Sequence, residues 1–471
     1  MRLERDSLGS VGVEDTALWG AQTQRSLQFF AIGEERMPLA IIHALAQIKA
    51  AAARSNVALG LLAPELGAAI ADAALAVARG EYDEQFPLRV WQTGSGTQSN
   101  MNVNEVIANL ANEGLGQARG SKSPIHPNDH VNLGQSSNDV FPSALHLSVA
   151  LALQQQVLPA LARLRDLLQR RSEDFADVLK IGRTHLMDAV PLRLGQEFSG
   201  YVDQLRQGEA GIRATLPGLY ALALGGTAVG TGLNTHPEFA TRVCALLQDW
   251  VGLPLHPAEN LFAALAGQEA LCQLSGQLRS LAMSLLKIGN DIRWMGSGPR
   301  AGLGELSLPE NEPGSSIMPG KVNPTQAEAL SMVCAQVFGN DAAVAFAASQ
   351  GNFELNVYKP VIGYNVLQSI RLLADAMDSF GEHCVRDLQA RPKELRRHLE
   401  SSLMLVTALV PRLGYEQAAA IAQRAHREGS TLREAALASG GITAAELDEI
   451  LRPERMLAPE PITRGEERKK P

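Results

Sequence analysis

A short loop in the C-terminal half of the chain carries residue types that could bind an anion and stabilise growing negative charge. Residues 314–324 read GSSIMPGKVNP. Lys321 supplies a full positive charge, and Ser315 and Ser316 supply two hydroxyl groups. Asn323, followed by a proline, is a favoured N-cap, so the loop should run into a helix whose free N–H groups form an anion site. The segment therefore predicts a binding site for a negatively charged substrate.

Other residues in and after this segment indicate its backbone conformation and the start of the following helix. Gly314 and Gly320 are expected to adopt positive φ and to let the loop come close to a ligand. Gln326, three residues after Asn323, completes a capping-box pattern. Glu328 falls near the start of the same helix, where a glutamate is most often simply favourable with the helix dipole.

A histidine lies in a second segment of interest, residues 181–186, which read IGRTHL. Imidazole is the side chain best suited to moving protons near neutral pH. An isolated histidine is nonetheless more often structural than catalytic. Gly182 and Arg183 indicate a loop between helices around His185.

Three polar segments precede that histidine. Residues 91–105 read WQTGSGTQSNMNVNE and should lead into a helix that begins near Asn100. Residues 126–132 read HPNDHVN, and residues 136–139 read SSND. Each of the three, taken alone, is ordinary turn and cap chemistry.

The 314–324 loop resembles the signature loop of the fumarase/aspartase superfamily of lyases. Its surroundings, PENEPGSSIMPGKVNPTQ, are similar to the class II, iron-independent fumarases in particular. Aspartases of this superfamily usually have alanine in place of Gly320 and lack the Thr325–Gln326 pair. The resemblance extends from WGAQTQ at 19–24 to LRPE at 451–454, which is almost the whole chain.

This resemblance implies an activity and a set of site residues. The expected activity is the reversible hydration of fumarate to (S)-malate, with Ser315 as the base and with His185, supported by Glu328, in the proton-transfer apparatus. The residues themselves do not decide between Ser315 and Ser316 as the base. The implied substrate-binding residues are Ser95, Gly96, Thr97, Ser136, Ser137, Asn138, Thr184, Ser316, Lys321, Val322 and Asn323.

The resemblance also implies a possible second dicarboxylate site, separate from the catalytic one. Its residues would be His126, Pro127, Asn128 and Asp129. A basic residue often found three positions before that histidine is Ser123 in this chain, although Lys122 adjoins it. No metal ion and no organic cofactor are expected, because the reaction involves no redox change and no acceptor.

Long helices must position these segments. Apolar residues recur at alternating steps of three and four, which predicts a bundle of nearly aligned helices. The clearest such seam is Leu271, Leu274, Leu278, Leu281, Leu285, Ile288, Ile292 and Met295, and two others are Val366, Ile370, Leu373, Met377, Phe380 and Cys384, and Val157, Leu161, Leu164 and Leu168.

The expected fold class is mainly α, with a three-domain fumarase/aspartase-like fold whose central long-helix bundle assembles into a multi-helix tetramer core. The predicted domains are an N-terminal mixed helical and loop domain (1–135), a central helical bundle (136–392) and a small C-terminal helical domain (393–471). Residues 464–471 should form a solvated, disordered tail. The family pattern is a homotetramer in which each active site combines segments from three subunits.

Bulk composition limits the classes of partner and compartment. The formal net charge of -8 gives no electrostatic reason to expect nucleic acid or an anionic membrane as a partner. No apolar run approaches the ~18 residues of a membrane span. The four scattered cysteines show no CxxC spacing, and no secretory signal or transit peptide is visible, so a cytoplasmic protein is expected.

The sequence offers three alternatives to a fumarase. The first is an aspartate ammonia-lyase of the same superfamily, which Gly320 and the Thr325–Gln326 pair disfavour. The second is a catalytically silent superfamily scaffold, which the intact set of catalytic residue types disfavours. A nucleotide-binding redox enzyme, suggested by the Gly94–Gly96 turn, fails because neither a preceding strand nor an acidic partner in a βαβ unit is present.

Overall fold

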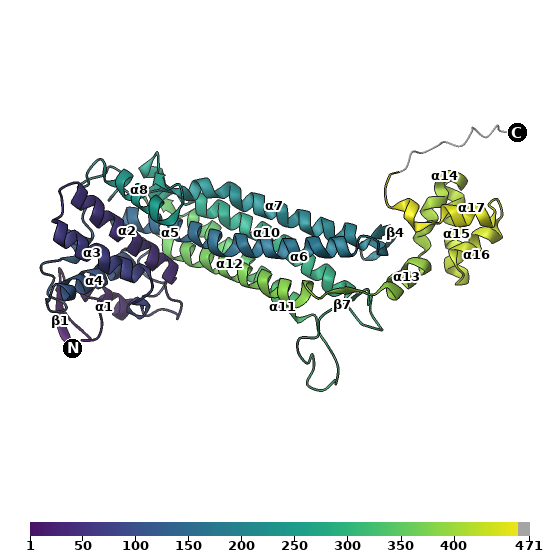
Figure 1. The fold of residues 1–471 in the computed structure, drawn as a ribbon, viewed down its shortest axis with the longest axis horizontal. Helices are drawn as coiled ribbons and strands as arrows, with labels where there is room; N and C mark the ends of the chain where they lie inside the picture. Colours follow the sequence, from purple (N-terminus) through teal and green to yellow (C-terminus); the bar gives the residue numbers. More distant parts are fainter. Residues whose placement is uncertain (460–471) are drawn as a thin grey trace. The chain divides into compact units, whose positions relative to one another are not determined.

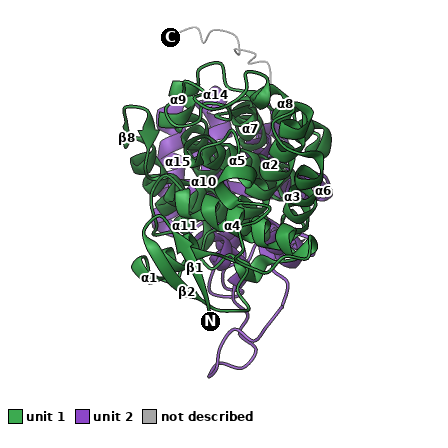
Figure 2. Ribbon diagram, turned by 90° about the vertical axis from the view of Figure 1, so that its left-hand side faces the viewer, with its two compact units in different colours: residues 1–161, 208–283, 332–375 green, residues 162–207, 284–331, 376–471 purple. Residues whose placement is uncertain are grey.

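The structure is a computed structural model that describes residues 1–459, so the tail predicted at 464–471 lies outside the described residues. Helices form most of the chain (Figure 1). The chain divides into two compact units, the first made of residues 1–161, 208–283 and 332–375, and the second of 162–207, 284–331 and 376–471 (Figure 2). The mainly α fold class is confirmed, and the division into three domains stays a prediction.

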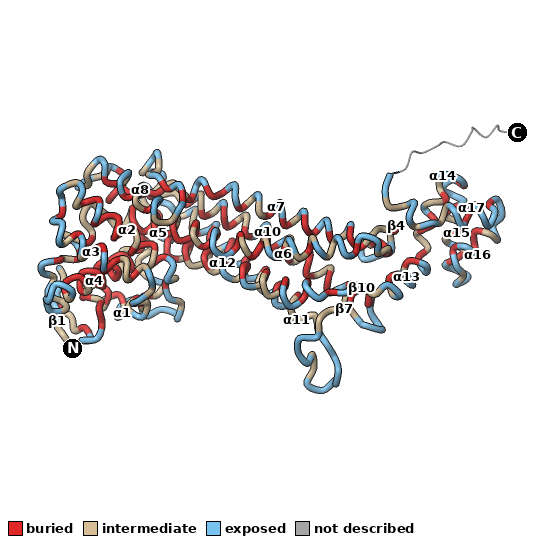
Figure 3. The backbone as a smooth tube through the Cα atoms, in the orientation of Figure 1, coloured by how far each residue is buried: buried red, intermediate tan, exposed pale blue. Residues whose placement is uncertain are grey.

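An alanine-rich helix, α2, lies at the centre of the first unit. Its alanines from Ala44 to Ala53 are buried, which lets α3, α5 and α8 pack closely against it (Figure 3). Gly60 and Pro64 separate the two helices, because α2 ends at Ala58 and α3 begins at Pro64. The helices of this region are α1 (Ala21–Phe29), α2 (Leu39–Ala58), α3 (Pro64–Ala78), α4 (Thr97–Gly114), α5 (Ser137–Ala152), α8 (Phe239–Val251) and α9 (Leu261–Ala266).

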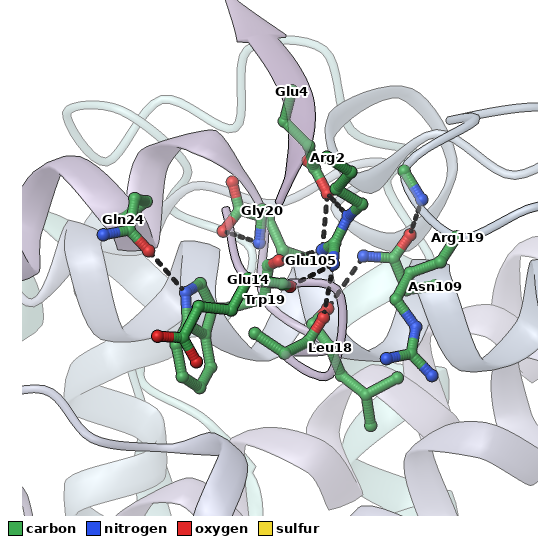
Figure 4. A network of polar contacts seen from close by, with 12 residues as sticks. Arg2, Glu4, Glu14, Leu18, Trp19, Gly20, Gln24, Glu105, Asn109 and Arg119 are labelled. Atoms are coloured by element: carbon green, nitrogen blue, oxygen red, sulfur yellow. Dashed lines mark hydrogen bonds and ion pairs between the residues drawn. The ribbon is translucent and has the colours of Figure 1, made fainter. Parts of the chain in front are cut away.

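A buried carboxylate anchors the N-terminal segment to α4. Glu105 accepts hydrogen bonds from the backbone N–H groups of Gly20, Gln22 and Thr23 and from the Thr23 hydroxyl, at 2.6–3.2 Å. Figure 4 shows Glu105 beside Gly20. These donors belong to the first turn of α1, so Glu105 satisfies a helix start from a distant part of the chain. Burial raises the pKa of this carboxyl group, and the four hydrogen bonds oppose that rise.

The predicted apolar seams belong to long helices, and Val157 and Cys384 lie in the π-helical turns that adjoin α6 and α12. Every residue of the three seams is buried. The spacing was therefore a correct guide to the buried face of each helix. The bounds of the long helices are α6 (Leu158–Asp174), α7 (Leu194–Tyr220), α10 (Glu269–Met295), α11 (Thr325–Ala348) and α12 (Lys359–Phe380).

The second unit ends in a group of short helices, as predicted for the residues after 393. Their apolar faces share one cluster with Ile181 of strand β3. Helix α17 begins with a capping box, in which the Thr443 and Glu446 side chains each accept from the other residue's backbone N–H. These helices are α13 (Pro392–Ser401), α14 (Val410–Leu413), α15 (Tyr415–Glu428), α16 (Leu432–Ser439) and α17 (Ala444–Ile450).

Strands occur only in two-stranded sheets within the described part of the chain. The longest pair, β3 (Leu179–Thr184) and β4 (Met187–Arg193), is an antiparallel hairpin. The others are β1 (Arg2–Asp6) with β2 (Gly9–Val13), β5 (Ala221–Leu222) with β6 (His256–Pro257), β7 (Leu306–Ser307) with β10 (Gln389–Ala390), and β8 (Gly351–Asn352) with β9 (Leu355–Asn356).

Two helical stretches pass a length and composition test for a membrane span, so the expectation that no apolar run approaches that length is wrong. The apolar window of Ser137–Asp174 is 67% buried, whereas that of Thr325–Ala348 is only 33% buried. Core helices of globular proteins pass the same test, which makes it weak evidence for a membrane. The second stretch, α11, leaves the large apolar side chains of Met332 and Phe346 exposed in the single chain.

Candidate active site

The 314–324 loop closes on itself ahead of α11. The Gly314 N–H donates to the Lys321 carbonyl at 2.7 Å, which joins the two ends of the loop. The Ser315 hydroxyl oxygen accepts from the backbone N–H groups of Ile317 (3.3 Å) and Met318 (3.0 Å). Two donors aimed at one hydroxyl oxygen favour its deprotonated form. The loop thus brings together Ser315 and Lys321, as the sequence predicted.

The two glycines of this loop are required for different reasons. Gly320 has φ +76°, as predicted, whereas Gly314 is not among the residues with positive φ. A Cβ at Gly314 would lie 2.5 Å from the Lys321 carbonyl oxygen. Gly314 is therefore required for close backbone approach, and Gly320 for its left-handed conformation.

The predicted capping box at the start of α11 is wrong. The helix begins at Thr325, one residue later than expected. The Asn323 side-chain amide donates instead to the Gly314 carbonyl at 2.6 Å, and the Gln326 side chain accepts from the Ser379 hydroxyl at 2.7 Å. Asn323 therefore braces the loop, because the loop closure presents a carbonyl that the sequence pattern could not reveal.

A cavity of about 680 Å³ adjoins this loop. Lys321, Arg293 and Arg391 line it together with a single carboxylate, Glu310. The excess of positive charge suits a dianion in a protein whose net charge is -8. Sequence reasoning missed both arginines, and the basic last turn of α10 is the signal that could have indicated Arg293.

The Thr184–His185 segment is part of a β-hairpin. The prediction that it forms a loop between helices is therefore wrong. Thr184 pairs with Met187 across the two strands, which leaves His185 and Leu186 as a two-residue turn. Both turn residues have positive φ, +57° and +61°. The hairpin presents the His185 side chain to solvent.

Glu328 and the remaining predicted residues of the second unit are exposed or partly buried. Glu328 lies in the first turn of α11, as expected, and its side chain is accessible. No hydrogen bond or ion pair joins His185 to Glu328 within the single chain over residues 1–459. Thr184, Ser316, Lys321 and Val322 are exposed, and Ser315 and Asn323 are partly buried. The pairing of His185 with Glu328 stays a prediction.

A chain of hydroxyl groups connects the polar segments of the first unit. The Ser95 and Thr97 hydroxyls share a hydrogen bond of 2.9 Å, and Thr97 and Ser137 share one of 2.7 Å. The Asn138 side-chain amide donates to the Ala228 carbonyl at 2.9 Å. Two segments about forty residues apart are thus brought together, as the family resemblance requires.

Helix starts position these hydroxyl groups. Helix α4 begins at Thr97, three residues before the predicted Asn100, because Gly96 in the left-handed conformation (φ +82°) turns the chain into the helix earlier. Helix α5 begins at Ser137 behind a capping box, in which Ser136 accepts from the Asn138 N–H and donates its own N–H to Asp139. The free N–H groups of both helices lie beside the hydroxyl chain.

Two buried lysines lie close to the same helix starts, and sequence reasoning missed both. The Lys49 ammonium donates to the Asn132 and Gln135 side-chain oxygens at 2.9 and 2.8 Å. The Lys359 ammonium donates to the Asn138 carbonyl at 3.4 Å. Burial lowers the pKa of Lys49 to about 7 and that of Lys359 to about 8, and the charge of Asp139 opposes both shifts. A lysine inside an alanine-rich helix was the available signal for Lys49.

The possible second dicarboxylate site forms a compact turn. His126 precedes the π-helical turn Pro127–Val131, and its Nδ1 accepts from the N–H groups of Asn128 and Asp129 at 3.3 Å. Burial lowers the pKa of His126, although Asp129 opposes the shift. Lys122 donates to the Arg5 carbonyl. The structure therefore gives Lys122 a partner of its own, and the function of this turn stays a prediction.

Most of the cysteine side chains are buried. No group of three or more His, Cys, Asp or Glu side chains among residues 1–459 is arranged to hold a metal ion. All four cysteines are free, and burial raises the pKa of the Cys244, Cys334 and Cys384 thiols to about 12. These three thiols are core side chains rather than reactive groups.

Known proteins match this chain over nearly its full length. The family model described as lyase matches residues 9–339, and the model for the fumarase C C-terminus matches residues 405–458. The fold and these matches define a lyase of the fumarase/aspartase superfamily.

Individual relatives narrow this class further. Class II fumarate hydratases from Thermosynechococcus vestitus and Methylorubrum extorquens are 61% and 59% identical, each covering 97% of this chain and 98% and 97% of the relative. The crystal structure of a class II fumarase from Schistosoma mansoni superimposes with a TM-score of 0.95 at 47% identity, covering 97% of this chain and 98% of that one. The chain belongs to the class II fumarate hydratase family.

Proposed function

We propose that this chain is a fumarate hydratase, a carbon–oxygen lyase that reversibly hydrates fumarate to (S)-malate. The observation that carries the proposal is 61% identity to a class II fumarate hydratase over 97% of the chain. The cationic cavity beside the 314–324 loop supports a dianionic substrate. Neither an ammonia-lyase nor a silent scaffold is favoured by any specific observation.

Proton abstraction next to a carboxylate is the difficult step of this reaction. The second negative charge that develops on the carboxylate must be met by fixed donors, and each such donor is worth about 10² to 10³ in rate. Lys321 and Asn323 fill this role, and the backbone N–H groups of the loop add to it. Ser315 is the base, because its hydroxyl oxygen already accepts two N–H groups that stabilise an alkoxide.

The departing hydroxide needs a proton. His185, oriented by Glu328, delivers it, and a general acid of this kind contributes roughly 10² to 10⁴ in rate. Ser95, Thr97, Ser136, Ser137 and Asn138 hold the substrate carboxylates. The hydroxyl chain from Ser95 to Ser137 supports this assignment, because those groups are already placed within hydrogen-bonding distance of one another.

A homotetramer with shared active sites completes the proposal. The exposed apolar side chains of α11 support such an assembly, since Met332 is 67% exposed and Phe346 is 62% exposed in the single chain. A catalytic pair contributed by different subunits agrees with His185 and Glu328 making no contact within one chain over residues 1–459. The tricarboxylic acid cycle is the matching metabolic setting, and free cysteines support a reducing, cytoplasmic compartment.

An ultraviolet absorption assay tests the activity. We expect incubation with (S)-malate to produce absorption from the fumarate double bond, with aspartate inert under the same conditions. Turnover of aspartate with malate inert would overturn the hydratase assignment in favour of an ammonia-lyase. Failure of both substrates in correctly assembled protein would favour a silent scaffold.

A further inference from the structure

The turn that carries His185 is a strained piece of backbone. His185 and Leu186 both have positive φ, +57° and +61°, and neither is a glycine. Non-glycine residues are strained in this region, and they persist only where the surroundings over-determine the conformation. Two-residue hairpin turns of this kind normally use Asn-Gly or a similar pair. Something outside the turn must therefore hold it.

A buried ion pair lies directly beside the turn. Arg183, two residues before His185, donates from Nη1 and Nη2 to the two carboxylate oxygens of Glu305, at 3.0 and 2.7 Å. The Glu305 side chain is fully buried and the Arg183 side chain is 15% exposed. A forked contact between guanidinium and carboxylate fixes direction as well as distance. The base of the turn is thus tied to one fixed carboxylate.

The surroundings of Glu305 keep its charge. Burial alone would raise the pKa of Glu305, but the Arg183 hydrogen bonds and the Lys180 charge hold it below the usual value. Lys180 lies 3.6 Å from the carboxylate and also forms an ion pair with Glu197 at 2.7 Å. His398 of α13 contacts the same carboxylate at 3.3 Å.

The backbone of Glu305 is fixed on both sides. Its N–H donates to the carbonyl of Met295, the last residue of α10, and its carbonyl accepts from the N–H of Arg391, each at 2.8 Å. Arg391 immediately precedes α13. The carboxylate is therefore held between a long helix and the C-terminal helices, and it cannot follow the turn if the turn moves.

We propose that Glu305 is a positioning residue that acts through Arg183 to hold the Thr184–His185 turn in its productive geometry. The inference rests on the proposed proton-transfer role of His185. Glu305 itself touches no substrate, because its side chain is fully buried. The fork replaces, by contacts from distant elements, the local turn chemistry that the sequence of this hairpin lacks.

Glu305→Gln tests the inference, since it keeps the shape of the side chain and removes its charge. We expect kcat to fall by about 10- to 100-fold, because misplacing a catalytic group by ~1 Å can cost about 10² in rate. We expect KM to change by less than about threefold, because the charged loop around Lys321 is untouched. Circular dichroism, thermal unfolding and molecular mass identify any variant that has lost its fold or assembly.

The same hairpin offers a matched control. Arg193, at the far end of β4, also forms an ion pair, with Asp177 at 2.8 Å. Arg193→Gln removes an arginine ion pair from the hairpin without touching the turn, and it should leave kcat within about twofold. The double variant of Glu305→Gln with Arg183→Gln should be no slower than the slower single variant, because both act through one contact.

The outcomes separate this inference from the catalytic assignment. Full turnover by His185→Asn would overturn the proton-transfer role itself. An inactive His185→Asn together with a folded, fully active Glu305→Gln would overturn only the positioning role. Equal losses in Glu305→Gln and Arg193→Gln would also overturn it, since the effect would then be general destabilisation. If Glu305→Gln does not fold, Arg183→Lys decides in the same way, because it keeps the charge and loses the fork.

Discussion

The surroundings of Ser315 support its proposed role as the base. Serine is a weak nucleophile and base unless its surroundings stabilise the alkoxide. In this loop, the Ile317 and Met318 N–H groups point at its oxygen, and Lys321 lines the same 420 Å³ hollow. The neighbouring Ser316 has no such pair of donors among the described residues. The geometry thus favours Ser315 where residue types alone left the two open.

Ser315→Ala should lower kcat by about 10² to 10⁴ with little change in KM, because it removes the base and leaves the cationic donors in place. Steady-state kinetics with malate measures both parameters. Ser316→Ala serves as the comparison and should act mainly on KM. Near-normal turnover by Ser315→Ala would move the base elsewhere.

Lys49 gives a prediction about pH and stability. Its pKa is about 7 in the folded chain and near 10.5 when exposed. Between these values the unfolded chain binds more protons than the folded one, so this group makes stability rise with pH across that window. Below pH 7 its burial penalty is fully present, and it fades as the pH approaches 10.5.

Thermal unfolding of the natural protein and of Lys49→Met at pH 7 and pH 9 measures this contribution. We expect the Tm of the natural protein to rise relative to that of the variant between the two values. A difference between the two proteins that does not change with pH would show that Lys49 keeps its ordinary pKa in the folded state.

At the scale of the element, helix starts place the candidate substrate groups. Gly96 ends the turn before α4, and its left-handed backbone points Thr97 toward Ser137. A Cβ at Gly96 would lie 2.3 Å from the Phe141 ring, so neither the conformation nor the space admits a side chain. The Gly94 position is tighter still, since a Cβ there would meet the Val357 carbonyl oxygen at 1.3 Å.

Gly96→Ala should therefore raise the KM for malate at least tenfold and lower Tm, because the Ser95–Thr97 turn must move. Gly114→Ala, at the other end of α4, is the matched control. No atom lies within 4 Å of a Cβ at Gly114, and an alanine in a helix is favoured over glycine by roughly 0.5–1 kcal/mol. If both variants keep the KM of the natural protein, the Gly96 turn does not position the substrate-binding groups.

At the scale of the whole molecule, the surface of α11 indicates assembly. Its apolar window is one-third buried in the single chain, although its composition is that of a core helix. Met332 and Phe346 are the most exposed of its large apolar side chains. Exposed apolar surfaces of this kind are commonly covered by a second copy or a partner.

Phe346→Glu combined with Met332→Glu should reduce the molecular mass in solution from that of a tetramer and abolish turnover together with it. Multi-angle light scattering and the malate assay follow the two effects. Tyr415→Glu on α15 replaces another exposed aromatic residue and should leave the mass unchanged. A tetramer that survives both α11 substitutions would place the interface elsewhere.

The sequence by itself determined the parts of this protein that depend on neighbours along the chain. The three-four spacing of Leu271 to Met295 predicted the buried face of α10, because helical periodicity is a local property. The break between α2 and α3 followed from Gly60 and Pro64 in the same way. The anion-binding character of the 314–324 loop could also be predicted from the sequence, because its charged and hydroxyl groups are close together along the chain.

Only the tertiary structure decided the features that depend on distant partners. Arg183 meets Glu305 across 122 positions of sequence, and that contact, rather than any turn motif, accompanies the hairpin under His185. The Asn323 side chain donates to the Gly314 carbonyl instead of capping α11. Lys49 donates to two side-chain amide oxygens more than eighty positions away. Burial and long-range hydrogen bonds set these positions, and no local pattern carries that information.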